Sequence, residues 1–280
     1  MRVILRWAWS QEHPRADLRL ARFKRVLRAA QRTQAYQPFL EIAGLATLEA
    51  IAWVDSVEGT LERLPPVDLA EFRGSPAAFE SPERARSTPQ AFRSPFEHTT
   101  KTAILMPGFE QTSTVKMFAQ NWTQGLKRLG ASALAAPVSV LREMAATIEL
   151  GQQEVHELRH FVVSFTGGDL GELSEEDREQ FWRAFQVPVF EQRVGFDGRV
   201  VASECEAHEG LHIMAERAAF EETAASELLM TSLTDLRYPT LRVGTRMARS
   251  IEHECCGCVN ASPRLVAARP RLTALAAAAI

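Results

Sequence analysis

Two short segments hold all four cysteines of this 280-residue chain. The first runs from Glu204 to His212 and contains Cys205, and the second is Cys255-Cys256-Gly257-Cys258. Thiolate sulfur and imidazole nitrogen are donors that a borderline-soft metal such as Zn²⁺ prefers, usually four of them in a tetrahedron. A Cys-x-Cys pair on a turn with glycine can supply two ligands, and the first segment can supply the other two.

These residues predict a structural Cys₃His zinc site. Cys205, Cys256 and Cys258 are three of the ligands, and the fourth is either His208 or His212, which leaves Cys255 over. The alternatives are free cysteines in a core, or a disulfide. No secretory signal opens the sequence, so we expect a reducing, cytoplasmic environment, which favours the metal.

Composition limits the classes of partner. With 46% hydrophobic residues, the chain can bury the core of one large domain or two small ones. A net charge of −3 leaves no broad basic field, so neither a nucleic acid nor an anionic membrane surface is expected as a partner. No run of about 20 apolar residues could span a bilayer. We therefore expect a small-molecule ligand or a partner protein.

The chain divides into four expected regions. Residues 1–64 predict an N-terminal helical segment, with amphipathic helices at Asp17–Arg32 and Leu45–Val57. Residues 65–98 hold six prolines and few large apolar side chains, which predicts an extended linker or covering loop. Residues 99–200 form an α/β core, and residues 201–280 form a β-rich zinc-binding segment.

Alternating strands and helices predict a parallel sheet in the core. Strands are expected at Thr102–Met106, Ala131–Pro137, His160–Thr166 and Val187–Glu191, and helices at Thr112–Leu129, Val138–Leu150 and Glu175–Phe185. Ser174 is placed to cap the last helix. Further strands are expected at Glu227–Leu233 and Thr240–Val243.

Glycine turns follow two of the core strands, at Gly167-Gly168-Asp169 and at Gly195-Phe196-Asp197. Ligands of open α/β sheets bind beyond the carboxyl ends of the strands, so both turns are expected to face one pocket. Arg242, from a later strand, is a candidate to pair with an anionic group of the ligand. The alternative is that the glycines only make tight turns and the aspartates only cap them.

The order of these motifs resembles the phenylacetate–coenzyme A ligase family of AMP-forming, adenylate-forming enzymes, which includes CapK-like proteins and deazaflavin coenzyme synthetases. Five blocks carry the likeness: Gly167-Gly168-Asp169-Leu170 with Leu173 to Glu176, Glu204 to Ile213, Glu227 to Leu233, Pro239 to Arg242, and Cys256 to Leu265. The resemblance implies an adenylate-forming large-lobe core, a nucleotide site at Gly167, and Cys205, His212, Cys256 and Cys258 as the metal ligands, with His212 preferred to His208.

Several positions depart from the family pattern. Ser94–Lys101 has no glycine for a phosphate loop, and Val194–Gly198 stands where members carry Tyr-Gly-x-Thr-Glu, with Asp197 the stand-in for the residue at Mg²⁺. Thr245-Arg246-Met247 replaces Thr-Gly-Asp, and Met247 cannot accept hydrogen bonds from ribose hydroxyls. The lobe that carries the catalytic lysine in members also has no counterpart.

These motifs are compatible with two functions and exclude a third. We expect a shortened, degenerate relative that has a structural zinc, binds a small ligand or a partner protein, and does not turn over ATP with Mg²⁺. The alternative is an active ligase that activates a carboxylate with ATP. A zinc hydrolase is excluded, because three thiolates and an imidazole close the tetrahedron and leave no position for water.

Overall fold

A nine-stranded sheet forms the centre of the computed structural model, which describes residues 17–83, 88–96, 100–118, 122–151, 157–258 and 260–268. Its strands are β1 (Thr102–Ile104), β2 (Val115–Met117), β3 (Ala133–Pro137), β4 (Phe161–Thr166), β5 (Val189–Val194), β6 (Val200–Glu204), β7 (Leu211–Ile213), β11 (Arg249–Glu252) and β12 (Arg264–Ala267). They lie in the order β11-β12-β7-β6-β5-β4-β3-β1-β2.

The sheet is parallel in one half and antiparallel in the other. Strands β2, β1, β3, β4 and β5 pair in parallel, whereas every pairing from β5 to β11 is antiparallel. The predicted parallel sheet is therefore confirmed for the core alone. Every residue of β3 and β4 is buried, as parallel strands covered on both faces require.

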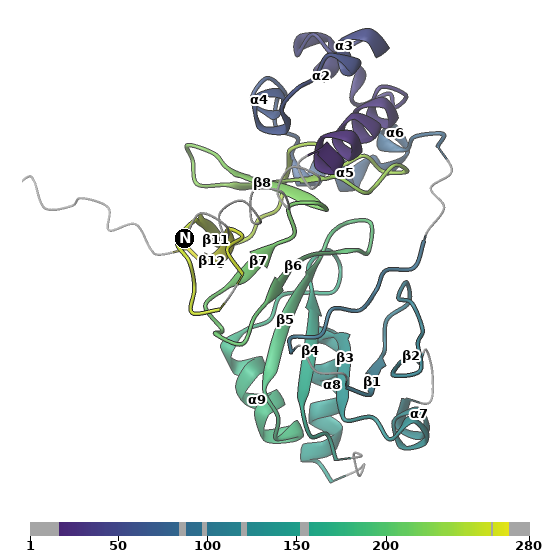
Figure 1. The fold of residues 1–280 in the computed structure, drawn as a ribbon, viewed down its shortest axis with the longest axis vertical. Coiled ribbons are helices and arrows are strands. Elements are labelled where there is room, and N and C mark those ends of the chain that lie inside the picture. Colours follow the sequence, from purple (N-terminus) through teal and green to yellow (C-terminus); the bar gives the residue numbers. More distant parts are fainter. Residues whose placement is uncertain are drawn as a thin grey trace, which may run out of the picture.

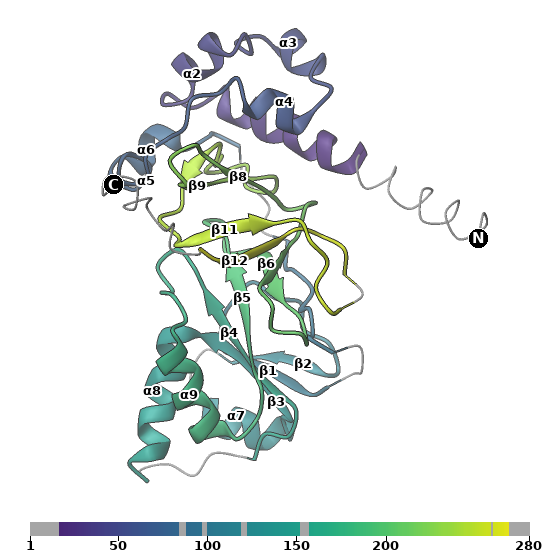
Figure 2. The ribbon, with the colours of Figure 1, turned by 90° about the vertical axis from the view of Figure 1, so that its left-hand side faces the viewer.

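Two long helices cover one face of the parallel half. These are α8 (Val138–Glu149) and α9 (Glu175–Phe185), which lie side by side in Figure 2, with α7 (Trp122–Leu129) near the far edge. The start of α9 is a capping box, in which the Ser174 hydroxyl accepts from the Asp177 amide at 3.1 Å and the Asp177 carboxylate accepts from the Ser174 amide at 2.8 Å. Gln186 ends the helix in the left-handed conformation, with φ 55°.

The N-terminal helices pack against a second, three-stranded sheet. They comprise a helix over residues 17–30, α2 (Gln37–Ile42), α3 (Leu48–Ala52), α4 (Val57–Leu61), α5 (Leu69–Gly74) and α6 (Pro76–Phe79). The small sheet is β8 (Ala218–Glu222), β9 (Leu228–Ser232) and β10 (Val243–Gly244), in the order β10-β9-β8. One apolar cluster joins these helices to Leu233, Leu241 and Val243, so regions far apart in sequence form one body at the top of Figure 1.

The structure differs from the expected elements in three places. The expected helix at Thr112–Leu129 is the strand β2 followed by α7, because β2 pairs with β1 at the sheet edge, a contact that local periodicity does not record. The expected helix at Leu45–Val57 is α3 alone, and α4 begins where it was to end. Of the expected strand at Thr240–Val243, only Val243 lies in a strand, as the first residue of β10.

The proline-rich region from 65 to 98 is more than a linker. It contains α5 and α6, which bury Leu69, Phe72 and Phe79 against the N-terminal helices. These side chains are buried in the N-terminal apolar cluster although the region holds six prolines. Residues 1–16 and the alanine-rich end from 269 lie outside the described residues. None of the helices that the structure describes has the length and apolarity that a membrane crossing needs.

Candidate metal centre and ligand cleft

Two adjacent hairpins bring the cysteines and a histidine together. Strand β7 pairs with β6 on one side and with β12 on the other, and His212 lies opposite Arg264 of β12. Cys205 directly follows β6, His212 is the central residue of β7, and the loop between β11 and β12 carries Cys256 and Cys258. The sheet register therefore sets which histidine faces the cysteine loop.

Gly210 allows the first hairpin to approach β12 closely. Its φ is 119°, and a Cβ placed there would lie 2.8 Å from the Leu265 carbonyl oxygen. Arg264, only 5% exposed at its side chain, then ties the two loops, because its guanidinium donates to Glu209 of the first and to Glu252 at the start of the second.

Four donor atoms converge between the hairpins. The Sγ atoms of Cys205, Cys256 and Cys258 and a ring nitrogen of His212 all lie within 4.8 Å of one another. His212 Nε2 is 3.2 Å from both Cys256 Sγ and Cys258 Sγ, and Cys205 Sγ is 3.8 Å from Cys256 Sγ. The edge of a tetrahedron with zinc–sulfur bonds of about 2.3 Å is close to the distance between the Cys205 and Cys256 sulfur atoms. The sulfur atoms of Cys256 and Cys258 lie only 2.8 Å apart and would have to separate around an ion. With that adjustment the group could hold a metal ion.

The hydrogen bond and the burial of His212 favour the neutral ring with a free lone pair on Nε2, the form that can bind a metal. Its Nδ1 is 3.1 Å from the Ser262 carbonyl oxygen, which can only accept, so Nδ1 carries the proton and Nε2 keeps its lone pair. Burial also lowers the pKa of His212, which favours the neutral ring. The amides of Cys258 and Asn260 each donate to a cysteine sulfur at 3.3 Å.

The donor set fits zinc in a closed structural site. Burial raises the pKa of Cys205 to about 12, so an ion that binds must displace a thiol proton. Three thiolates and one imidazole complete the four-coordinate shell that structural zinc prefers. In such a shell the ion would hold the two hairpins together, and it would have no position for a reacting water.

His208 and Cys255 lie outside this group. The His208 ring stacks on Phe190, with centroids 4.6 Å apart, and its Nδ1 is 3.1 Å from a Glu204 carboxylate oxygen. Cys255 is exposed. Of the two histidines that spacing left open, the structure places His212 among the cysteines.

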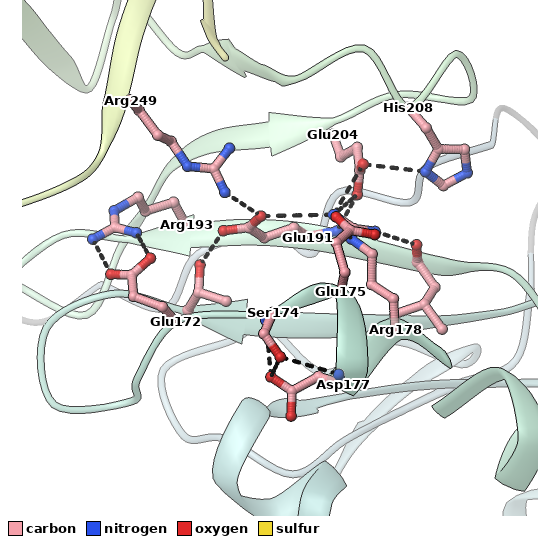
Figure 3. A network of polar contacts seen from close by, with 12 residues as sticks. Glu172, Ser174, Glu175, Asp177, Arg178, Glu191, Arg193, Glu204, His208 and Arg249 are labelled. Carbon is pink, nitrogen blue, oxygen red and sulfur yellow. Dashed lines mark hydrogen bonds and ion pairs between the residues drawn. The ribbon is translucent and has the colours of Figure 1, made fainter. Parts of the chain in front are cut away.

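Beside the metal group lies a buried polar network that the sequence did not predict (Figure 3). The side chains of Glu191 and Glu204 are 1% and 4% exposed. Arg249 donates to Glu191 at 2.7 Å, and Arg178 lies 3.2 Å from both Glu204 oxygens. The sequence feature that could have indicated this network is the run of polar residues after Phe190, in a strand whose other residues are apolar.

An open cleft of about 580 Å³ lies beyond the carboxyl ends of β4 and β5. We call it the glycine cleft, because Gly167, Gly168, Gly195 and Gly198 are among its lining residues, together with Asp169. Its apolar lining residues are Phe72, Pro76, Met106, Leu170, Phe196 and Tyr238, and Arg73 also lines it. The two predicted glycine turns thus line the same cleft.

Gly167 is required by close packing at this point. A Cβ on it would lie 2.6 Å from the Val194 carbonyl oxygen, and its φ is 96°. The neighbouring Gly168, with φ 56°, has no heavy atom within 4 Å of an added Cβ and so opens onto the cleft.

Asp197 and Arg242 do not line the cleft. The Asp197 carboxylate accepts from the Arg199 amide at 3.1 Å and from the Thr234 hydroxyl at 2.6 Å, so it stabilises its own turn. Arg242 is 3.2 Å from Glu221 and donates to the Leu64 carbonyl oxygen. These contacts hold the Arg242 side chain against Glu221 of β8 and the segment after α4, and not among the lining residues of the cleft.

Comparison with known proteins identifies the fold. No family model matches the sequence, and a search of curated proteins finds no relative. Among solved structures, 2-hydroxyisobutyryl-CoA ligase in an open conformation with 2-HIB-AMP and CoA matches 89% of this chain and 67% of its own, with a TM-score of 0.62 and 12% identity. The same ligase in the postadenylation state with R3-HIB-AMP matches 91% and 67%, with a TM-score of 0.64 and 13% identity. The chain therefore has the fold of adenylate-forming CoA ligases.

Proposed function

We propose that this protein is a non-catalytic relative of the adenylate-forming ligases that binds a small molecule through a flat aromatic group in the glycine cleft. The five sequence blocks favour descent from the phenylacetate–CoA ligase and CapK-like branch. The observation that carries the proposal is the cleft itself, which is lined by both glycines and aromatic side chains at the carboxyl ends of β4 and β5.

The cleft favours a planar heteroaromatic ligand. Aromatic and apolar side chains supply a surface on which a flat ring can stack, and glycine lets the backbone approach the ring edge. The two solved structures of 2-hydroxyisobutyryl-CoA ligase, which has the same fold, are complexes with 2-HIB-AMP and R3-HIB-AMP. An adenine-like ring is therefore the ligand class that we assign to this site.

The charges around the cleft do not suit acyl-adenylate chemistry. Transfer at a phosphorus atom needs a metal and a cationic clamp on the charge that develops. Asp197, the one acid expected to stand near Mg²⁺, is held by its own turn. Of the described residues that line the cleft, the charged ones are Arg73 and Asp169, 3.5 Å apart.

The second part of the proposal is a structural zinc ion held by Cys205, His212, Cys256 and Cys258. These residues supply the donor set described above, and the ion would stabilise the β6–β7 and β11–β12 hairpins. The alternative function is an active AMP-forming ligase that activates a carboxylate with ATP, and pyrophosphate exchange distinguishes the two.

Calorimetry with adenosine tests the binding site. Gly168→Asn places a side chain at the open wall of the cleft, and asparagine tolerates the left-handed backbone. We expect the variant to weaken adenosine binding at least tenfold. Gly151→Asn is the matched control, because Gly151 has φ 63° with no heavy atom near an added Cβ and lies after α8, away from the cleft.

The same protein samples test whether the protein lacks ligase activity. We expect no ATP–pyrophosphate exchange above background with aryl or alkyl carboxylates. Exchange above background would contradict the non-catalytic proposal and support the active ligase. Equal adenosine binding by wild type and Gly168→Asn, or no binding at all, would instead remove the cleft as the ligand site.

A further inference from the structure

The outer surface of α2 and α3 exposes large apolar side chains. Ile42 at the end of α2 is 74% exposed, Leu48 at the start of α3 is 54% exposed, and Trp53 directly after α3 is 86% exposed. The described residues expose six large apolar side chains, so half of them lie within twelve positions of the chain. The two helices lie at the end of the molecule opposite α8 and α9 (Figures 1 and 2).

This surface stands on a fixed base. Leu45 and Ile51, on the same stretch of chain, are at most 1% exposed and belong to the N-terminal apolar cluster. The Thr47 hydroxyl caps the start of α3 by accepting from a backbone amide of the first turn at 3.1 Å. The Lys24 ammonium donates to the Ala52 carbonyl oxygen at the other end of α3, at 2.7 Å. Because α3 is held at both ends, its exposed side chains form a preformed surface.

The same stretch carries only negative charge. Residues 37–62 contain no lysine, arginine or histidine, and they contain five exposed acids, Glu41, Glu49, Asp55, Glu58 and Glu62. Glu58 is paired with Arg19, and the other four form no ion pair with a described residue. Such a surface repels an anionic membrane, a nucleic acid or an identical acidic surface, and it attracts a basic partner.

The combination of exposed apolar side chains and unpaired acids fits one recurring mode of recognition. An amphipathic helix lays its apolar face against an apolar surface, and its flanking charges meet charges of the opposite sign. Tryptophan is among the side chains that contribute most to such contacts. Trp53 and Leu48 can contact the apolar face of the helix, and Glu49 and Asp55 can pair with its lysines or arginines.

We propose that the α2–α3 surface, defined as Ile42, Leu48, Glu49, Trp53 and Asp55, is the docking site for a basic amphipathic helix of a partner protein. None of these residues lines the glycine cleft. The inference therefore goes beyond the proposed function and does not depend on it.

Fluorescence anisotropy with two labelled peptides of about 18 residues, five helical turns, tests the proposal. One peptide has leucine on one helical face and lysine on the other, and the second has glutamate in place of lysine. We expect the wild type to bind the lysine peptide at least about tenfold more tightly than the glutamate peptide, with a preference that falls as salt rises.

Two variants and one control locate the contact. Trp53→Gln should weaken binding of the lysine peptide about tenfold, because it removes the aromatic anchor. Glu49→Gln combined with Asp55→Asn should weaken it about threefold or more and reduce its dependence on salt. Trp182→Gln is the matched control, because Trp182 is 52% exposed on α9 at the opposite end of the molecule, and it should bind as the wild type does.

Several outcomes would overturn the proposal. Equal binding of the two peptides, or no binding of the lysine peptide, would remove the preference for a basic helix. Unchanged binding by Trp53→Gln, or an equal loss in Trp182→Gln, would overturn the assignment to the α2–α3 surface. A wild-type dimer in sedimentation that Trp53→Gln dissociates would make a second copy of the chain the occupant. Binding to phosphatidylserine vesicles that is lost in Trp53→Gln would make a membrane the occupant.

Discussion

Single substitutions of the cysteines test the metal group. Cys256→Ser or Cys258→Ser should lower bound zinc well below one per chain and destabilise the protein by more than about 4 kcal/mol, because a closed zinc site contributes directly to folding. Metal analysis after purification without chelator and thermal melting measure both effects. Cys255→Ser, at an exposed sulfur outside the group, should change neither.

The two histidines provide a second test of the same site. His212→Ala should lose the metal, whereas His208→Ala should keep it, since His208 pairs with Glu204 and stacks on Phe190. A chain that holds a full equivalent of zinc without His212, or none in wild type, would contradict the assignment.

The sequence predicts those features of the site that depend on residues close together in the chain, and not those that depend on distant partners. The residue types identified a Cys₃His group, because all four cysteines lie in two segments. Spacing alone left His208 and His212 open, and only the family resemblance preferred His212. The physical reason is the pairing of β7 with β12, which local spacing does not encode. Glu191 was missed for the same reason, because its partner Arg249 lies 58 residues away.

At the scale of elements, α9 links pH to stability. The hydrogen bond from Arg142 lowers the pKa of Asp177 from 3.8 to about 2. A lowered folded-state pKa contributes stability at pH values above 3.8, and this contribution is lost as pH falls toward 2. Because the Arg142 side chain is 44% exposed, the effect is modest, about 1 kcal/mol or less.

The measurement is the melting temperature of wild type and Asp177→Asn at pH 6 and pH 3. At pH 6 wild type should have a higher melting temperature than Asp177→Asn. At pH 3 the difference in melting temperature between the two proteins should be smaller. Glu179→Gln, an exposed acid on the same helix, should show no such change. A difference that stays constant with pH would show that Asp177 acts through its shape as a cap and not through its charge.

The hairpin that carries Cys205 and His212 can be tested through Gly210. Gly210→Ala should destabilise the protein by about 1–3 kcal/mol and weaken metal retention, because its Cβ would meet the Leu265 carbonyl oxygen at a strained backbone angle. Gly151→Ala shares the left-handed backbone but meets no neighbour, so it should cost less and keep the metal. Full metal retention in Gly210→Ala at high temperature would argue against this hairpin as the support of the site.

Local signals explain which elements were predicted. The bounds of α9 follow from Ser174 as a cap and from apolar residues at helical spacing, so the sequence predicted them to the residue. The sequence predicts a helix where strand β2 lies, because the extended conformation of β2 depends on its pairing with β1. The few apolar residues of α5 and α6 are buried only because the N-terminal helices pack against them, which a local sequence pattern does not reveal.

At the scale of the whole molecule, one hydrogen bond links the N-terminal helices to the region of the small sheet. The Leu241 amide donates to the hydroxyl of the buried Tyr36 at 2.9 Å, and burial raises the pKa of that hydroxyl. Tyr36→Phe should leave the amide without a partner and destabilise the protein by about 1–3 kcal/mol. Denaturant unfolding measures the loss, and zinc content should not change.

Tyr238→Phe is the control for this prediction, because the chain has two tyrosines and Tyr238 is only half-buried. Its melting curve should stay within about 0.5 kcal/mol of wild type. If Tyr36→Phe is equally mild, the two regions are joined by apolar packing alone.

The bond between Tyr36 and Leu241 spans 205 positions of the chain, and this separation has a consequence for synthesis. A ribosome that adds about 5–20 residues per second needs roughly 10 to 40 seconds to pass from one partner to the other. During that interval the apolar faces of α2 to α6 are outside the ribosome without the sheet that later covers them. The nascent chain thus presents a binding surface for chaperones that the finished protein no longer has.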